Sequence, residues 1–257
     1  MASRAKARDD CRLCRQPSVL QNSHVLPEWG YGPLYDNKHR MIALRSGGSQ
    51  PASADYMQKG IREPLLCTRC ETHLSRYEKY ARDLLMTPAR LVLPPPHRQV
   101  VNRADYKPFK LFQLSLLWRA HLSKHQLFAA VDLGPRHAER IRTMLETENP
   151  GTAADYPCFL SVLYFAGEPR ADVMLQANSR RTEGQRTYSL IFAGFHWMFV
   201  VSRHTQHHRM ASTLALQPDG GFHLHGFEGM DSKGLRDYAR SLMLPNRQNV
   251  ERLRGRP

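Results

Sequence analysis

Four of the five cysteines stand in two Cys-x-x-Cys pairs, Cys11/Cys14 and Cys67/Cys70. Two intervening residues let a tight turn direct both sulfur atoms at one ion, and four thiolates form a closed tetrahedral site for Zn²⁺. We therefore predict a structural zinc site, with four buried reduced thiols as the alternative. Cysteines used in this way indicate a reducing compartment, so we expect a cytoplasmic protein without disulfides.

The residues around these pairs indicate how the pairs are positioned. A short apolar stretch, His24–Leu26, follows the first pair and suits a strand. After the second pair, residues 71–85 carry Leu74, Tyr77, Ala81 and Leu84 at helical spacing on one face. We predict a treble-clef zinc unit from this order: a turn with the first cysteine pair (a zinc knuckle), a strand, a polar insert, a second knuckle and a helix.

The first third of the chain resembles the HNH family of ββα-metal nucleases. Three segments carry the resemblance in the family's order: Cys11-x-x-Cys14, then Ser23-His24-Val25-Leu26-Pro27, then Leu66-Cys67-Thr68-Arg69-Cys70-Glu71. The resemblance implies a general base at His24 that activates water against a phosphodiester bond. It also implies one Mg²⁺ or Mn²⁺ ion, held by Glu71 at the start of the helix, with His73 as a substitute or additional ligand.

Two positions differ from the family's pattern. Ser23 replaces the usual acidic residue, and Arg62-Glu63 stands where the family has an Asn. A zinc scaffold without catalysis therefore stays open as an alternative. His24 can instead form hydrogen bonds within the knuckle, Glu71 can be a solvated acid favoured by the helix dipole, and His73 can be an ordinary helix residue.

The charge of the chain points to a polyanionic partner. Lys and Arg number 37 against 23 Asp and Glu, which gives a net charge of +14. Nucleic acid is the simplest partner for such a chain, and we expect DNA. Basic residues of three loops are the expected contacts, and solvated or disordered loops are the alternative. These residues are Lys38, Arg40, Arg45, Arg180, Arg181, Arg203 and Arg209.

The whole chain is expected to have an α+β fold in two parts. We predict a zinc-binding domain over residues 1–90, a Pro-rich linker over 91–108 and an α+β domain over 109–257. The second domain begins with a buried helix at 109–118, with Arg119 at its polar end, and continues with an amphipathic helix that turns Arg142 outward. Strands at 158–166, 171–177, 187–202 and 211–217 follow, then a final helix at 231–244 and a frayed tail. No apolar run approaches the ~20 residues of a membrane span, so we expect no membrane association.

These features together predict a metal-dependent DNA endonuclease that hydrolyses phosphodiester bonds by an HNH-like mechanism. A role in restriction or in defence against foreign DNA follows by analogy alone. A non-catalytic zinc-containing nucleic-acid-binding protein explains the charge and the cysteines equally well. An adaptor that binds a protein partner is a third interpretation, and it leaves the net charge of +14 unexplained.

Overall fold

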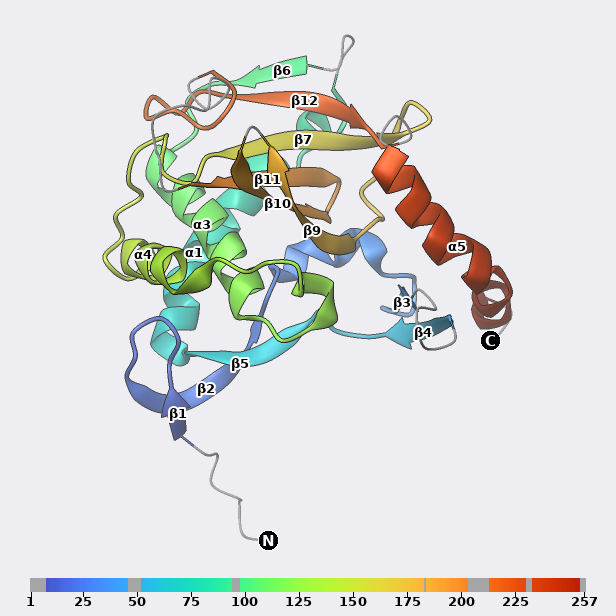
Figure 1. The fold of residues 1–257 in the computed structure, drawn as a ribbon, viewed down its shortest axis with the longest axis horizontal. Helices are drawn as coiled ribbons and strands as arrows, with labels where there is room; N and C mark the ends of the chain where they lie inside the picture. Colours follow the sequence, from blue (N-terminus) through green and yellow to red (C-terminus); the bar gives the residue numbers. More distant parts are fainter. Residues whose placement is uncertain are drawn as a thin grey trace, which may run out of the picture.

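The computed structural model describes residues 8–45, 52–93, 98–182, 184–202, 213–229 and 233–254. Within them the chain is a mixed α+β structure that starts near the cysteine pairs and ends in a long helix (Figure 1). The predicted fold class is confirmed at this level. The predicted DNA contacts Arg203 and Arg209 lie outside the described residues.

A seven-stranded sheet forms one layer of the molecule (Figure 1). The strand order is β6-β12-β7-β11-β10-β9, and the short β8 pairs with β7. β12 runs parallel to β7, and the other neighbours are antiparallel. The strands are β6 Arg98–Val101, β7 Cys158–Phe165, β8 Glu168–Pro169, β9 Leu175–Thr182, β10 Gln185–Phe192, β11 Phe195–Val201 and β12 Phe222–Glu228.

The apolar run at 187–202, predicted as one strand, is a hairpin of β10 and β11. Ala193 and Gly194 form its turn with φ of 53° and 83°. Two consecutive residues at positive φ are the mark of the type I′ turn, whose twist matches that of the two strands. The strand predicted at 211–217 is also wrong within 213–217, where the structure has turns.

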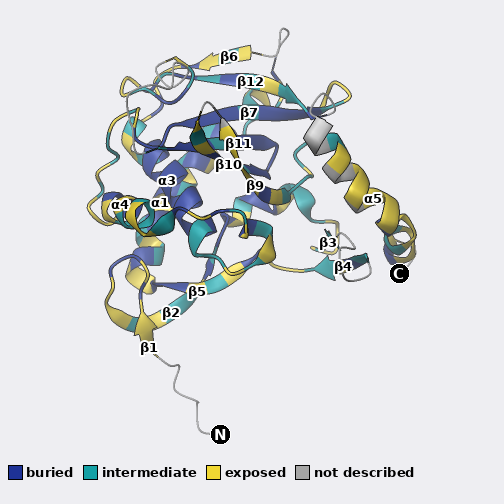
Figure 2. Cartoon of the chain, viewed as in Figure 1, coloured by how far each residue is buried: buried dark blue, intermediate teal, exposed yellow. Residues whose placement is uncertain are grey.

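Helix α3, Tyr106–Leu122, lies against this sheet and is buried around most of its circumference (Figure 2). The ring of Phe112 lies 5.7 Å from that of Trp197 in β11, and Phe109 lies 5.2 Å from Phe222 in β12. Asp105 caps the helix by accepting a hydrogen bond from the backbone N–H of Lys107. The other helices near it are α1 Thr68–Leu85, α2 Pro88–Leu91 and α4 Gly134–Glu146, and the 3-10 turn η3 Gln126–Phe128 follows α3.

The cysteine pairs belong to a small three-stranded sheet at the opposite side of the helices (Figure 1). Its order is β1-β2-β5, and α1 follows β5 without a loop. Leu74, Tyr77 and Ala81 are buried on α1 as predicted, whereas Leu84 is half-buried and its neighbour Leu85 is buried. The strands are β1 Arg8–Asp10, β2 Pro17–His24 and β5 Arg62–Cys67.

The insert between β2 and β5 is structured over the described residues. It contains two 3-10 turns, η1 Glu28–Gly30 and η2 Gly32–Leu34, and a hairpin of β3 Met41–Arg45 with β4 Ser53–Met57. The hairpin packs against the C-terminal helix α5, Lys233–Arg254, where the hydroxyl of Tyr56 donates to the carbonyl of Leu253 at 2.9 Å. The tail expected to fray is therefore helical as far as Arg254, although most of its side chains are exposed (Figure 2).

Most of the buried apolar side chains form one cluster that reaches from the cysteines to the large sheet, and Phe159, Val200 and Ala215 form a second, small one. Leu93, which lies in the predicted linker, is buried, and its backbone N–H donates to the hydroxyl of Tyr164. The domain boundary at 91–108 stays a prediction from the sequence. None of the helices in the described part of the chain combines the length and the apolar character that crossing a membrane requires.

Candidate functional sites: four cysteines and His24

The four paired cysteines converge, as their spacing predicts. Their Sγ atoms all lie within 4.8 Å of one another. Four Zn–S bonds of 2.3 Å at tetrahedral angles separate the sulfurs by about 3.8 Å, and Cys14 and Cys67 have their sulfurs 3.9 Å apart. The backbone N–H of Cys67 also donates to the sulfur of Cys11 at 3.3 Å. This group fits a four-coordinate metal ion with thiolate ligands.

Two local turns bring the sulfurs together. Cys11 and Cys14 lie in the turn between β1 and β2, whereas Cys67 precedes α1 and Cys70 lies in the first turn of that helix. The first turn is tied to β5 by the backbone N–H of Arg12, which donates to the carbonyl of Leu65 at 2.9 Å. Each pair thus lies within one turn, and the first turn is also fixed by a hydrogen bond to β5.

The surroundings of the cluster favour thiolate at one sulfur in particular. Burial raises the pKa of Cys11 and of Cys70. For Cys14 the effect of burial is outweighed by hydrogen bonds from the backbone of Gln16 and from Cys11, Cys70 and Arg69, which lower the pKa to about 7. A nearby guanidinium is a common means of holding a cysteine in its thiolate form.

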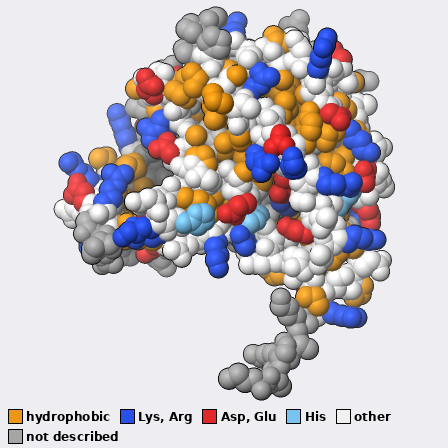
Figure 3. Space-filling view, turned by 180° about the vertical axis from the view of Figure 1, so that it is seen from behind, with side chains coloured by type: hydrophobic (Ala, Val, Ile, Leu, Met, Phe, Trp, Pro, Cys, Tyr) orange, Lys and Arg blue, Asp and Glu red, His pale blue; other side chains and the backbone are white. Residues whose placement is uncertain are grey.

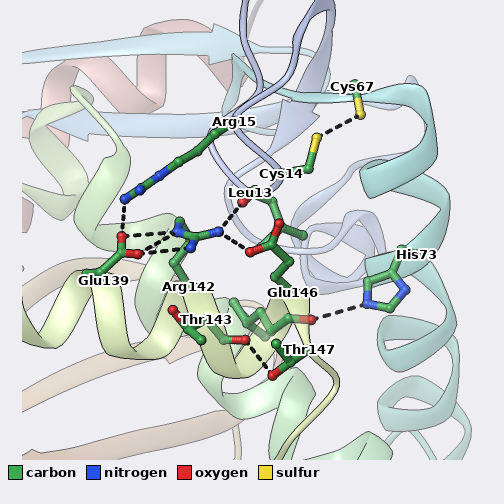
Figure 4. Close-up of polar contacts among 11 residues, drawn as sticks. Leu13, Cys14, Arg15, Cys67, His73, Glu139, Arg142, Thr143, Glu146 and Thr147 are labelled. Carbon is green, nitrogen blue, oxygen red and sulfur yellow. Dashed lines mark hydrogen bonds and ion pairs between the residues drawn. The ribbon is translucent and has the colours of Figure 1, made fainter.

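Arg142 fixes the first cysteine turn to α4 (Figure 4). Its guanidinium donates to the carbonyl of Leu13 at 2.6 Å and pairs with Glu146 at 2.5 Å and with Glu139 at 2.9 Å. Arg15 reaches the same Glu139 from the turn. Only 11% of the Arg142 side chain is exposed, so its predicted outward orientation is wrong. Arg142 has partners on the cysteine turn and on α4. The helical pattern of the sequence cannot indicate the partner on the turn.

His24 is the last residue of β2, and its imidazole contacts two charged side chains. Its Nε2 accepts a hydrogen bond from Nε of Arg62 at 2.8 Å and also contacts a carboxylate oxygen of Glu28. Burial lowers the pKa of His24, and the positive charge of Arg62 lowers it further. Because the unperturbed pKa of His is near 6.5, the imidazole is neutral at pH 7 and can accept a proton.

A buried arginine from α3 holds the backbone at His24. Arg119, whose side chain is 1% exposed, donates to the carbonyl of His24 at 2.8 Å and pairs with Glu78 of α1 at 2.6 Å. The prediction that Arg119 lies at a polar helix end is wrong, because α1 and β2 cover that end of α3. A fully buried guanidinium is costly unless it is paired in this way. Its only signal in the sequence is a single charge within an apolar run.

Glu71 does not share the environment of His24. Its carboxylate accepts a hydrogen bond at 2.5 Å from the hydroxyl of Ser23, which is buried. Ser23 and His24 are neighbours on a strand, so their side chains point to opposite faces of β2. Glu71 therefore contacts the face opposite the His24 imidazole.

His73 lies with the end of α4. Its Nε2 is 3.4 Å from the carbonyl oxygen of Leu145, and its Nδ1 is 2.7 Å from a guanidinium nitrogen of Arg76. Among the residues that the structure describes, the four cysteines are the only group of three or more His, Cys, Asp or Glu side chains close enough to share an ion. A nearby surface pocket of about 380 Å³ is lined by Leu13, Cys14, Arg69, Cys70, His73, Glu146 and Glu148.

The expected nucleic-acid contacts are spread over several elements. Lys38 is exposed in the turn before β3, whereas Arg40 pairs with Asp36 at 3.0 Å. Arg180 and Arg181, expected in a loop, lie in β9. Arg45 is the last residue of β3. Lys and Arg side chains are scattered over the face in Figure 3, with Asp and Glu side chains between them.

Comparison of the chain with protein-family models, with curated proteins and with solved structures gave no match. The resemblance to HNH nucleases therefore stays a prediction from the cysteine pairs and the segment around His24. A functional assignment has to be argued from the two sites themselves.

Proposed function

We propose that the protein cleaves phosphodiester bonds of nucleic acid at His24, on a treble-clef unit held together by zinc. The observation that supports this most directly is the imidazole of His24 at the end of β2, in contact with the guanidinium of Arg62 and the carboxylate of Glu28. These are a proton acceptor, a phosphate-binding group and an orienting group. The order β2, β5, α1 around them is also the order of elements in a ββα-metal unit.

In the proposed reaction His24 and Arg62 act on the water and the phosphate. His24 takes a proton from water, the water oxygen attacks phosphorus, the P–O ester bond breaks, and the leaving oxygen takes a proton from solvent. Arg62 holds a non-bridging phosphate oxygen. In the present structure Arg62 and Glu28 both contact Nε2 of His24, so a bound phosphate would have to displace both side chains before this nitrogen can activate water. Arg119 keeps the carbonyl of His24 in place.

Zinc has a structural role in this proposal. Cys11, Cys14, Cys67 and Cys70 would hold it, and their sulfur separations suit its bond lengths. A zinc ion with four protein ligands has no open position for water or substrate, so it stabilises the fold and takes no part in the chemistry. Binding would join the first turn to the start of α1.

A catalytic Mg²⁺ or Mn²⁺ ion does not fit the residues that the family resemblance suggests for it. Glu71 is bonded to Ser23 on the opposite face of β2 from His24, and His73 contacts the carbonyl of Leu145. We derive no step through such an ion. Whether cleavage depends on a divalent metal is decided by comparing the rates in Mg²⁺, in Mn²⁺ and with chelator.

A second function, nucleic-acid binding without catalysis, is favoured by one observation. Arg62 and Glu28 both contact the Nε2 atom of His24, so that nitrogen is occupied until a ligand rearranges them. The net charge of +14 suits a binder as well as a nuclease.

The test compares His24→Ala with two carboxylate variants, Glu28→Gln and Glu71→Gln. Wild type and variants, each checked for zinc content, are incubated with single-stranded and duplex DNA and with RNA, in Mg²⁺, in Mn²⁺ and with chelator. Loss of a general base lowers the rate by about 10² to 10⁴, so His24→Ala should nearly abolish cutting. Glu28→Gln should slow it, and Glu71→Gln should leave it close to wild type.

Other outcomes decide against parts of the proposal. Metal-dependent cutting that is lost in Glu71→Gln would restore the family's metal position and contradict our interpretation of the geometry. If no protein cuts while all bind DNA with affinity that falls steeply with salt, the binder is correct. Equal cutting by wild type and His24→Ala would exclude His24 as the base.

A further inference from the structure

An aromatic stack lies beside the His24 site, on the insert between β2 and β5. The rings of Tyr35 and His39 are parallel within 25°, with centroids 3.9 Å apart. Tyr35 is half-buried and His39 is exposed. The hydroxyl of Tyr35 lies 3.5 Å from Oε1 of Glu28, the residue whose other oxygen contacts the imidazole of His24. Glu28 thus lies between the stack and the proposed base.

The turn that carries His39 is fixed by hydrogen bonds. The carboxylate of Asp36 accepts from the backbone N–H groups of Lys38 at 3.0 Å and Arg40 at 2.8 Å, and the backbone N–H of Asp36 donates to the carbonyl of Arg40 at 2.7 Å. His39 itself has φ of 56°, in the left-handed region that few residues with a side chain adopt. Such a conformation persists only where the surrounding contacts hold it, and it is often found at binding sites.

The start of the same segment is anchored in the core. The ring of Trp29 lies 5.9 Å from that of Phe112 in α3 and 6.0 Å from that of Phe192 in β10. Tyr31 is fully buried, and its hydroxyl accepts a hydrogen bond from the backbone of Ile61 at 3.0 Å. The stack is therefore held on a segment with a defined position relative to His24.

We propose that the outer face of the His39 ring binds an unpaired base, so that the protein acts on single-stranded or locally unpaired nucleic acid. Proteins that bind single strands stack bases on aromatic side chains beside basic groups, and the bases within a closed duplex do not offer their faces. Tyr35 supports the His39 ring from behind, and the exposed Lys38 lies next to it in the chain, where it can meet a phosphate. The inference rests on the proposed function for the reaction, although binding of the base does not require cleavage.

The test is binding of a single-stranded oligonucleotide that contains 2-aminopurine, whose fluorescence falls when the base stacks on a ring. The full chain with His24→Ala is used, so that the strand is not cut. His39→Asn removes the ring but keeps a residue that tolerates positive φ, and His39→Phe keeps a ring. Loss of one base–aromatic stack should weaken single-strand binding about tenfold, and His39→Phe should restore both affinity and quenching.

The matched duplex is the second ligand, and it should bind more weakly than the single strand and show no quenching. Equal affinity and quenching for His39→Asn and its parent would overturn the inference, as would equal binding of duplex and single strand. If 2-aminopurine is quenched in a way that depends on His39 but the wild type never cuts, base stacking on His39 is supported and the proposed nuclease activity is contradicted. If the wild type cuts and His39→Asn changes neither the affinity nor the quenching, the nuclease activity is supported and base stacking on His39 is contradicted.

Discussion

The cysteine cluster and the His24 site are built in opposite ways. Each pair of cysteines lies in one turn, and long-range contacts join the two turns and fix the first of them to Arg142 of α4. The side chains and backbone at His24 are instead held by residues 38 and 95 positions away, Arg62 and Arg119. The cysteine cluster is built from two short turns of the same kind. The His24 site forms only when α3 and the insert between β2 and β5 pack against β2.

The electrostatics of the two sites follow from this difference. Four thiolates outweigh the charge of the one Zn²⁺ ion they would bind, and the groups that favour the thiolate of Cys14, the backbone of Gln16 and the guanidinium of Arg69, are close to the two pairs in the chain. The imidazole of His24 takes its lowered pKa from burial and from the charge of Arg62. Variants outside the zinc unit should therefore alter His24 while leaving the metal in place.

The largest expected effect is that of Cys67→Ser, which removes one ligand of the cluster. Structural zinc sites carry apparent binding free energies of about 10–16 kcal/mol, much of it available to folding, so the small sheet and α1 should lose stability strongly. Zinc content and thermal unfolding followed by circular dichroism measure this. Cys158→Ser, at an unpaired cysteine buried in β7, is the control and should keep its zinc. A Cys67→Ser protein with one zinc and an unchanged melting temperature would contradict the prediction.

Arg119→Met tests the other site. Breaking a buried ion pair by removing one partner costs about 3–5 kcal/mol, because Glu78 loses its partner and the carbonyl of His24 loses its donor. Urea unfolding measures the loss, and the double variant Arg119→Met/Glu78→Gln should recover part of it. Zinc content should stay at the wild-type level. If Arg119→Met lost zinc as well as stability, the two sites would be coupled. That result would contradict the statement that they are held by different contacts.

The parts of the structure that the sequence predicts are those whose signal is local. Cys-x-x-Cys spacing fixes the cluster, and helical spacing fixes the buried face of α1. The β10–β11 hairpin was missed because both strands lie within the sheet, so they form one apolar run. Gly194 is the one residue whose type indicates the turn, because an alanine such as Ala193 gives no sign in the sequence that its φ is positive.

The His24 site was predicted less well, since burial of a charged side chain depends on what packs around it. The sequence identifies His24 as a candidate, but nothing near it in the chain indicates Arg62 or Arg119 as a partner. Arg142 was misplaced for the same reason, because its acceptor on Leu13 comes from the cysteine turn. Glu71 and His73 were grouped with His24 by the order of a motif, and strand alternation separates Glu71 from it.

One source of acid sensitivity should lie away from both sites. Burial lowers the pKa of His196 in β11 to about 4, with a smaller effect from Arg180, and the ring nitrogen lies 3.0 Å from the hydroxyl of Ser189. The unfolded chain binds this proton below about pH 6.5 and the folded chain does not until about pH 4, so stability is lost as pH falls through that window. The full shift corresponds to about 3 kcal/mol.

Urea unfolding of His196→Asn at several pH values tests the source of this sensitivity. Its stability should fall less than that of wild type between pH 6.5 and pH 4. His24 also has a lowered pKa and is partly exposed, so it should account for a smaller share. Parallel curves for wild type and His196→Asn would assign the acid sensitivity to other groups.

The smallest effect comes from two glycines that flank Tyr31, the buried ring 6.1 Å from the imidazole of His24. A Cβ at Gly60 would lie 2.3 Å from Cε2 of Tyr31, whereas a Cβ at Gly32 meets nothing within 4 Å. Overpacking of this kind costs about 1–3 kcal/mol, since the fully buried ring has no space to move into. Gly60→Ala should therefore lose stability, and Gly32→Ala should change it by less than about 1 kcal/mol.

The informative result is what happens at His24 in Gly60→Ala. A shifted Tyr31 would disturb the segment that carries Glu28, so the NMR signals of the His24 imidazole should change while zinc content does not. Cleavage should fall further than the loss of folded protein explains. If the imidazole signals of Gly60→Ala match those of Gly32→Ala, the insert does not position His24, and the contacts from Arg62 and Arg119 are sufficient to hold the site.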